Sequence, residues 1–185
     1  MNFNNWQNAD DAAIKELPFY IAEWLAEFGS LTEKLSRYVE QVKLDVLHEG
    51  IGILTADEAS ALQSKEASCQ VREVVLFGPD KPWIFARTCM PFTSKHLIER
   101  LGNKPLGSIL FSDEELRRQF LQVCQLEESN PLYQSASSYL EKENMLVNGE
   151  QPTLWARRSL WQKKDSNDGM LVCEVFLPDA PLYKK

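Results

Sequence analysis

Charged side chains stand in stretches of the sequence that otherwise look like buried strands. Arg72 lies in VREVVLF, Arg87 in PWIFARTCM and Glu174 in VCEVF. Because alternate side chains of a strand share one face, Arg72 should lie beside Val74 and Leu76. A charge left unpaired among apolar neighbours costs several kcal/mol. Each of these groups therefore needs a counter-charge, which either the protein or a ligand supplies.

Two interpretations account for these charges. In the first, Arg72 pairs with Glu174 or Glu73 in an internal salt bridge, or one face of the sheet is wet. In the second, the face lines a ligand pocket: Arg72 binds a carboxylate through two parallel N–H bonds, and Glu174 accepts a hydrogen bond from a ligand hydroxyl. For any one residue, the sequence alone favours the first interpretation.

A further pair of arginines, Arg157 and Arg158, lies in LWARRSLW between two tryptophans. Adjacent side chains of a strand point to opposite faces, so at most one of the two can enter the same pocket. We interpret them as solvated residues at a sheet edge.

The sequence contains no pattern typical of a metal centre. The four cysteines show no CxxC spacing, and the two histidines, His48 and His96, are far apart. We therefore expect no metal site, and reduced cysteines in a cytoplasmic protein. Cys173 is interpreted as a small core residue, since no histidine is patterned near it.

Length and charge argue against several classes of protein. The 185 residues, 44% hydrophobic and 25% charged, predict one globular domain over residues 1–185. The formal net charge of -7 argues against nucleic-acid binding. The N-terminus lacks the basic and apolar regions of a secretory signal, and no apolar run approaches the roughly 20 residues of a membrane helix.

Hydrophobic periodicity and turn residues predict a chain that mixes helices and strands. Helices are predicted over 17–28, 30–40, 93–101, 113–125 and 131–142, with a short helix or loop over 55–63. Strands are predicted over 42–48, 71–77, 83–90, 154–162 and 170–177. The second and third strands, and the last two, are predicted to form hairpins because turn residues separate them. The fold class predicted is α+β, with a single antiparallel sheet and helices packed around it.

Four blocks, in order, resemble the motifs of chorismate pyruvate-lyases, the enzymes that make 4-hydroxybenzoate for ubiquinone. The blocks are VREVVLFGPDKPWIFARTCMP, LGNKPLGSILF, LWARRSL and CEVFLPDAPLY. GSLTEKL is similar to a weaker N-terminal block, in which the family often has methionine in place of Leu31; an apolar swap of similar volume keeps a wall contact. The resemblance spans residues 17–183, although the stretch 125–151 is longer than the family leads us to expect.

The resemblance implies that helical flaps cover an enclosed ligand pocket. It also implies substrate contacts by Arg72, Glu174, Leu31 and Leu106, with Arg87 as a second cationic candidate. Arg72 would bind a substrate carboxylate, Glu174 would accept a hydrogen bond from the ring hydroxyl, and the two leucines would be apolar walls. Whether Glu174 also removes the ring proton stays open at this point.

The implied reaction is the conversion of chorismate to 4-hydroxybenzoate and pyruvate. Aromatisation drives it, so no metal or organic cofactor is expected, and the protein mainly holds a dianion in one reactive conformer in a dry site. Chorismate and 4-hydroxybenzoate are thus the expected partners of a chain that we expect to be monomeric. The alternative is a ligand-sensing domain of similar fold, against which the acidic chain shows no basic DNA-binding helix pair.

Overall fold

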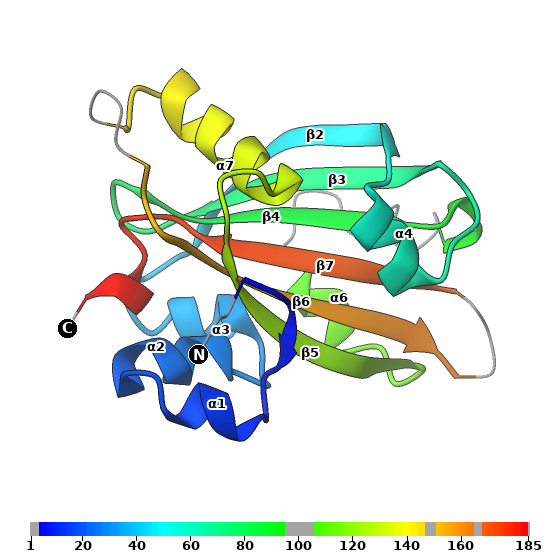
Figure 1. Cartoon of the computed structure of the whole chain (residues 1–185), viewed down its shortest axis with the longest axis horizontal. Coiled ribbons are helices and arrows are strands. Elements are labelled where there is room, and N and C mark those ends of the chain that lie inside the picture. The colour runs from blue at the N-terminus through cyan, green and yellow to red at the C-terminus, as the bar shows by residue number, and fades with distance from the viewer. Residues whose placement is uncertain (1–3, 95–105, 147–150, 165–167, 185) are drawn as a thin grey trace.

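A seven-stranded antiparallel sheet organises the chain (Figure 1). The structure is a computed structural model that describes residues 4–94, 106–146, 151–164 and 168–184. The strands are β1 (Gln7–Asn8), β2 (Lys43–Ile53), β3 (Ser68–Phe77), β4 (Pro82–Met90), β5 (Leu116–Leu126), β6 (Leu154–Lys163) and β7 (Gly169–Phe176). Their order across the sheet is β1-β5-β6-β7-β4-β3-β2. The predicted α+β class with an antiparallel sheet is confirmed.

The register of the central strands sends the predicted charges to different faces. Glu73 on β3 lies opposite Arg87 on β4, and Glu174 on β7 lies opposite Ala86 on β4. Because side chains alternate along a strand, Ala86 and Glu174 share one face while Arg87 points to the other. Arg72, the neighbour of Glu73, therefore shares the face of Glu174.

Two helices, α4 (Ala56–Leu62) and α7 (Pro131–Lys142), cover one face of the sheet, the face toward the viewer in Figure 1. The capping box of α4 is confirmed: the Thr55 hydroxyl accepts from Glu58 N at 3.1 Å, and the Glu58 carboxylate accepts from Thr55 N at 2.9 Å. α7 buries its apolar side against the sheet. The long stretch 125–151 thus supplies, in α7, part of the cover of this face.

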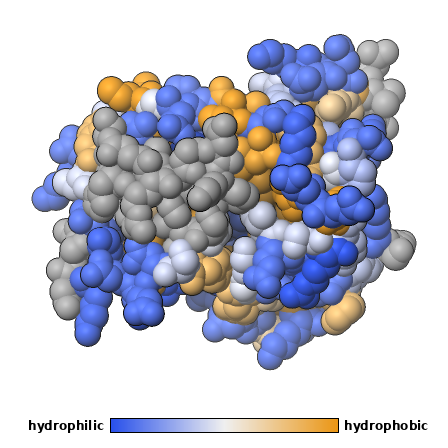
Figure 2. Space-filling model, turned by 180° about the vertical axis from the view of Figure 1, so that it is seen from behind, coloured by the Kyte–Doolittle hydropathy of each residue, from blue (hydrophilic) through white to orange (hydrophobic). Residues whose placement is uncertain are grey.

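The other face is covered at its two ends. The helices there are α1 (Ala12–Lys15), α2 (Phe19–Leu25) and α3 (Leu31–Leu35) at one end, and α6 (Gly107–Leu110) at the other. Trp24 and Leu35 are fully buried at the first end, and Trp161 packs with Leu110 at the second. Figure 2 shows this side of the molecule, where hydrophobic patches lie among hydrophilic residues.

The helix predicted over 113–125 is wrong, because most of these residues form strand β5. β5 pairs with β6 along its length and with β1 near its C-terminal end. Leu121 and Val123 are buried on one face, as a strand's alternation requires. Apolar residues at positions 116, 120 and 124 also suit a helix, and only hydrogen bonding to the two neighbouring strands decides between the two structures.

The other predicted elements differ from the observed ones mainly in their ends. The helix over 17–28 is confirmed as the shorter α2, and the one over 30–40 ends at Leu35. The Ser30 hydroxyl caps α3 by accepting from Glu33 N at 3.2 Å. Most of the helix predicted over 93–101 lies outside the described residues. Among the described helices, none is long and apolar enough to cross a membrane.

Candidate active site

Arg72 and Glu174 line one pocket on the sheet face opposite α4 and α7. Two rows of paired residues form its floor. One row runs from Arg72 through Thr88 and Val172 to Ser159; the next runs from Val74 through Ala86 and Glu174 to Arg157. Residues distant in sequence thus meet on one surface, with Arg72 and Glu174 separated by strand β4.

The two apolar residues predicted to contact substrate, Leu31 and Leu106, lie on the walls of this pocket. Leu31 belongs to the core cluster beneath α1–α3, whereas Leu106 packs against the cluster at α6. The two walls lie close together where Gly107 faces Ser30. A Cβ at position 107 would be only 2.8 Å from Ser30 Oγ. Glycine at position 107 therefore lets α6 approach the N-terminus of α3 above the sheet.

Glu174 has Arg157 as its partner, and not Arg72. Arg157 Nε donates to Glu174 Oε2 at 2.5 Å, and its Nη1 donates to the carbonyl oxygen of Glu27 at 2.7 Å. Arg157 and Arg158 point to opposite faces, as expected, but both are buried because β6 lies inside the sheet. Their interpretation as solvated edge residues is wrong.

Arg72 is 3% exposed and lies deep in the pocket. Its Nε is 3.3 Å from Glu49 Oε2, and the Glu49 side chain is 42% exposed. Burial lowers the pKa of Arg72, and the Glu49 charge only partly opposes this effect. Among the described residues, neither Glu174 nor Glu73 forms the ion pair with Arg72 that the first interpretation predicted. Because Arg72 is buried, a ligand carboxylate in the pocket would meet a desolvated guanidinium.

The family model described as chorismate lyase matches residues 1–185. The chain belongs to the chorismate lyase family. It is 33% identical to the chorismate pyruvate-lyase of Hamiltonella defensa, over 97% of this chain and 88% of the relative. It is 34% identical to a probable chorismate pyruvate-lyase of Vibrio vulnificus, over 97% of this chain and 89% of the relative.

Solved structures share the fold of this chorismate lyase family member at much lower sequence identity. A GntR-family transcriptional regulator from Bacillus cereus is 14% identical, with a TM-score of 0.52 over 75% of this chain and 92% of that one. The C-terminal domain of PhnF is 12% identical, with a TM-score of 0.54 over 79% of this chain and 88% of that one. These likenesses concern the fold alone.

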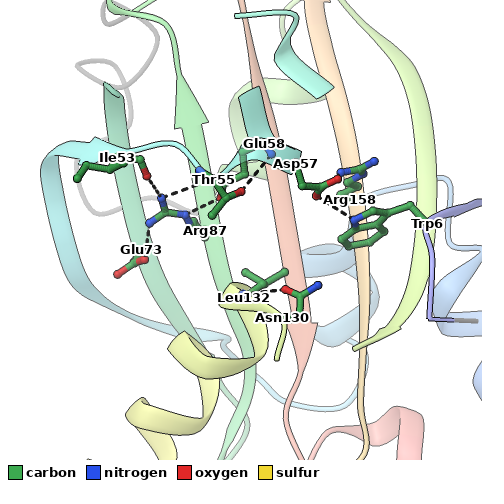
Figure 3. Close-up of polar contacts among 10 residues, drawn as sticks. All are labelled: Trp6, Ile53, Thr55, Asp57, Glu58, Glu73, Arg87, Asn130, Leu132 and Arg158. Atoms are coloured by element: carbon green, nitrogen blue, oxygen red, sulfur yellow. Dashed lines mark hydrogen bonds and ion pairs between the residues drawn. The ribbon is translucent and has the colours of Figure 1, made fainter. Parts of the chain in front are cut away.

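The structure does not bring Arg87, the second predicted cation, to the pocket of this family member. Arg87 lies on the α4 face, where its Nε donates to Glu58 Oε1 at 2.7 Å and its Nη1 to Glu73 Oε1 at 2.8 Å (Figure 3). Its Nη2 donates to the carbonyl oxygen of Ile53 at 2.9 Å. Burial alone would lower the pKa of Arg87, but Glu58 and Glu73 raise it above its ordinary value. The internal salt bridge is the better interpretation for this residue.

Arg158 belongs to a similar network on the same face (Figure 3). Its Nη1 donates to Asp57 Oδ2 at 2.7 Å, and its guanidinium lies 4.4 Å from the ring centre of Trp6. Trp6 Nε1 donates to the same Asp57 oxygen at 3.0 Å. These contacts join α4 and the N-terminal segment to the sheet, which indicates a structural role.

Arg118 on β5 is a charged residue of the pocket that was not among the site residues predicted from the sequence. The prediction of a helix over 113–125 did not place Arg118 on either face of the sheet. The alternation of Leu121 and Val123 in the same stretch was the available signal for a strand. The strand has a bulge between Arg118 and Phe120, which shifts the alternation by one residue. Arg118 therefore lies on the same face as Leu121 and Val123.

Proposed function

We propose that this protein converts chorismate to 4-hydroxybenzoate and pyruvate, as the names of its relatives suggest. The observation that carries the proposal is the concentration of Arg72, Arg118, Arg157 and Glu174 on one sheet face between two hydrophobic clusters. Chorismate is a dianion with a ring hydroxyl, so it offers groups of complementary charge and hydrogen bonding.

In the proposed complex, Arg72 binds the ring carboxylate and Glu174 accepts a hydrogen bond from the ring hydroxyl. Leu31 and Leu106 hold the ring between them. Arg157 fixes the orientation of the Glu174 carboxylate and offsets its charge, which favours a hydrogen-bonding role for Glu174 over that of a base. Arg87 is left out of the proposed site, since it lies on the opposite face with acidic partners of its own.

The reaction balances without a co-reactant. The proton on ring carbon C4 passes to the methylene carbon of the enolpyruvyl group while the bond between C3 and the ether oxygen breaks. The ring gains its third double bond and becomes 4-hydroxybenzoate, and the departing group becomes pyruvate. The protein contributes by holding the side chain over C4 and by excluding water.

The decisive experiment is incubation of the protein with chorismate in the presence of EDTA. We expect 4-hydroxybenzoate, followed by its absorbance, and an equal amount of pyruvate, followed with lactate dehydrogenase. Activity restored only by a divalent ion would contradict the expected cofactor-free reaction. Tight binding of 4-hydroxybenzoate without any turnover of chorismate would instead identify a ligand-sensing domain.

The role of Glu174 is tested by Glu174→Gln, which keeps an acceptor oxygen and nearly the same volume. If Glu174 only accepts a hydrogen bond, the cost should be about 1–3 kcal/mol. An obligatory base would lose roughly a hundredfold to ten-thousandfold in the chemical step. Single-turnover kinetics with enzyme in excess avoids masking by slow product release. A loss near ten-thousandfold with unchanged affinity for 4-hydroxybenzoate would make Glu174 the base.

Four cysteines, all buried, carry free thiols. Buried reduced thiols suit a reducing compartment, and we propose that the protein acts in the cytoplasm. A monomeric state stays a prediction, which the elution volume of the purified protein would test.

A further inference from the structure

Arg118 is a pocket residue whose polar groups are incompletely used. Its Nη1 donates to the carbonyl oxygen of Phe28 at 2.6 Å. Its guanidinium lies 4.6 Å from the ring centre of Trp161 and 5.4 Å from that of Phe111. Its Nε is buried and has no hydrogen-bond partner among the described residues. The two aromatic rings and the carbonyl therefore fix the group without neutralising it.

The charges around the pocket do not balance at this position. Arg157 is paired with Glu174, and Arg72 lies 3.3 Å from a Glu49 carboxylate oxygen. In the part of the chain that the structure describes, Arg118 forms no ion pair with any carboxylate. Burial, followed by the nearby charge of Arg157, lowers the pKa of Arg118 to about 10. The charges of Glu174 and Glu27 oppose these effects only in part, and a carboxylate arriving with a ligand would further favour the charged guanidinium.

The order of the polar groups across the sheet matches their order along the proposed substrate. Arg72 is on β3, Glu174 on β7 and Arg118 on β5, with β4 and β6 between them. In chorismate the ring carboxylate lies across the ring from the hydroxyl, and the enolpyruvyl ether is attached beside that hydroxyl. A substrate held by Arg72 and Glu174 therefore directs its enolpyruvyl group toward the β5 side of the pocket.

We propose that Arg118 binds the enolpyruvyl carboxylate of chorismate and so positions the side chain for proton transfer from C4. The inference rests on the proposed function and adds to it the residue that recognises the second carboxylate. Pyruvate carries that carboxylate away, so 4-hydroxybenzoate has no group for Arg118 to bind. Arg118 should thus distinguish substrate from aromatic product, whereas Arg72 should bind both.

The test compares Arg118→Met with Arg117→Met. Methionine keeps an unbranched apolar stem between Trp161 and Phe111 but removes the guanidinium. Arg117 is exposed, so its variant makes the same change in net charge outside the pocket. For Arg118→Met we expect kcat/KM for chorismate to fall at least about 30-fold, while the Kd for 4-hydroxybenzoate changes less than about threefold. Arg117→Met should match the parent in both measurements.

A second variant, Arg118→Lys, keeps the charge and most of the stem but loses the guanidinium fork. We expect kcat/KM to fall about tenfold, again with unchanged affinity for 4-hydroxybenzoate. This variant carries the test if Arg118→Met does not fold. Parent-like kcat/KM in the folded variants, or an equal loss of affinity for 4-hydroxybenzoate, would overturn the role of Arg118. Lack of chorismate turnover by the parent protein would instead overturn the proposed function.

Discussion

Arg72→Ala is expected to remove most chorismate turnover while the protein stays folded. Arg72 is 3% exposed on the pocket face, with Val74 beside it on β3 and Thr88 opposite it on β4. Removing a charge-assisted pair with a buried carboxylate costs on the order of 2–5 kcal/mol. The corresponding loss in kcat/KM is about 30-fold to several-thousand-fold. Affinity for 4-hydroxybenzoate should fall as well, because that product keeps the ring carboxylate.

The control for this variant is Glu49→Gln. Glu49 lies near Arg72, so this change removes the ion pair but leaves the guanidinium in the pocket. If Arg72 binds substrate, Glu49→Gln keeps turnover close to that of the parent. Circular dichroism and thermal unfolding verify that both variants are folded. Turnover at the parent rate by folded Arg72→Ala would show that the assignment is wrong, and loss of folding would favour a structural salt bridge.

Arg87→Met is expected to lower the free energy of unfolding by about 3–5 kcal/mol. The Glu58 side chain is 7% exposed and the Arg87 side chain 15% exposed, so the change leaves a buried carboxylate without its counter-charge. It also leaves the carbonyl oxygen of Ile53 without this donor. Urea unfolding followed by circular dichroism measures the effect.

Lys43→Met is the matched control, since Lys43 and Asp45 form an ion pair between exposed side chains. Such a pair contributes little, about 0–1 kcal/mol. The double variant Arg87→Met with Glu58→Gln should recover part of the stability, because the buried carboxylate charge of Glu58 is then removed together with its partner. If Arg87→Met keeps the urea midpoint of the parent but loses chorismate turnover, Arg87 has the substrate role that the resemblance implies.

The Arg87–Glu58 pair also predicts a dependence of stability on pH. Burial alone would raise the pKa of Glu58, but hydrogen bonds from Arg87 and Thr55 and the charge of Arg87 lower it below its ordinary value. The stabilisation is therefore present at neutral pH and is lost as the pH falls through the lowered pKa of Glu58. Arg87→Met should weaken this acid dependence.

Local patterns in the sequence were enough to identify the charged residues that lie among apolar neighbours. Period-two alternation placed Arg72 and Glu174 among apolar neighbours, and it sent Arg157 and Arg158 to opposite faces. Turn residues defined the hairpin of β3 and β4 and that of β6 and β7, because these pairs are adjacent in the chain. Local sequence patterns are enough to predict strand pairing where the partner strand is the next element in the chain.

The partner of each arginine depends instead on the folded arrangement of the strands and helices. Arg157 pairs with Glu174, and Arg87 pairs with Glu58 on α4, because the strand order places elements from distant parts of the chain side by side. β5 is a strand because β1 and β6 satisfy its backbone hydrogen bonds, and that pairing turns Arg118 into the pocket. Side-chain periodicity is local, whereas ion pairs and sheet hydrogen bonds depend on the neighbours that folding supplies.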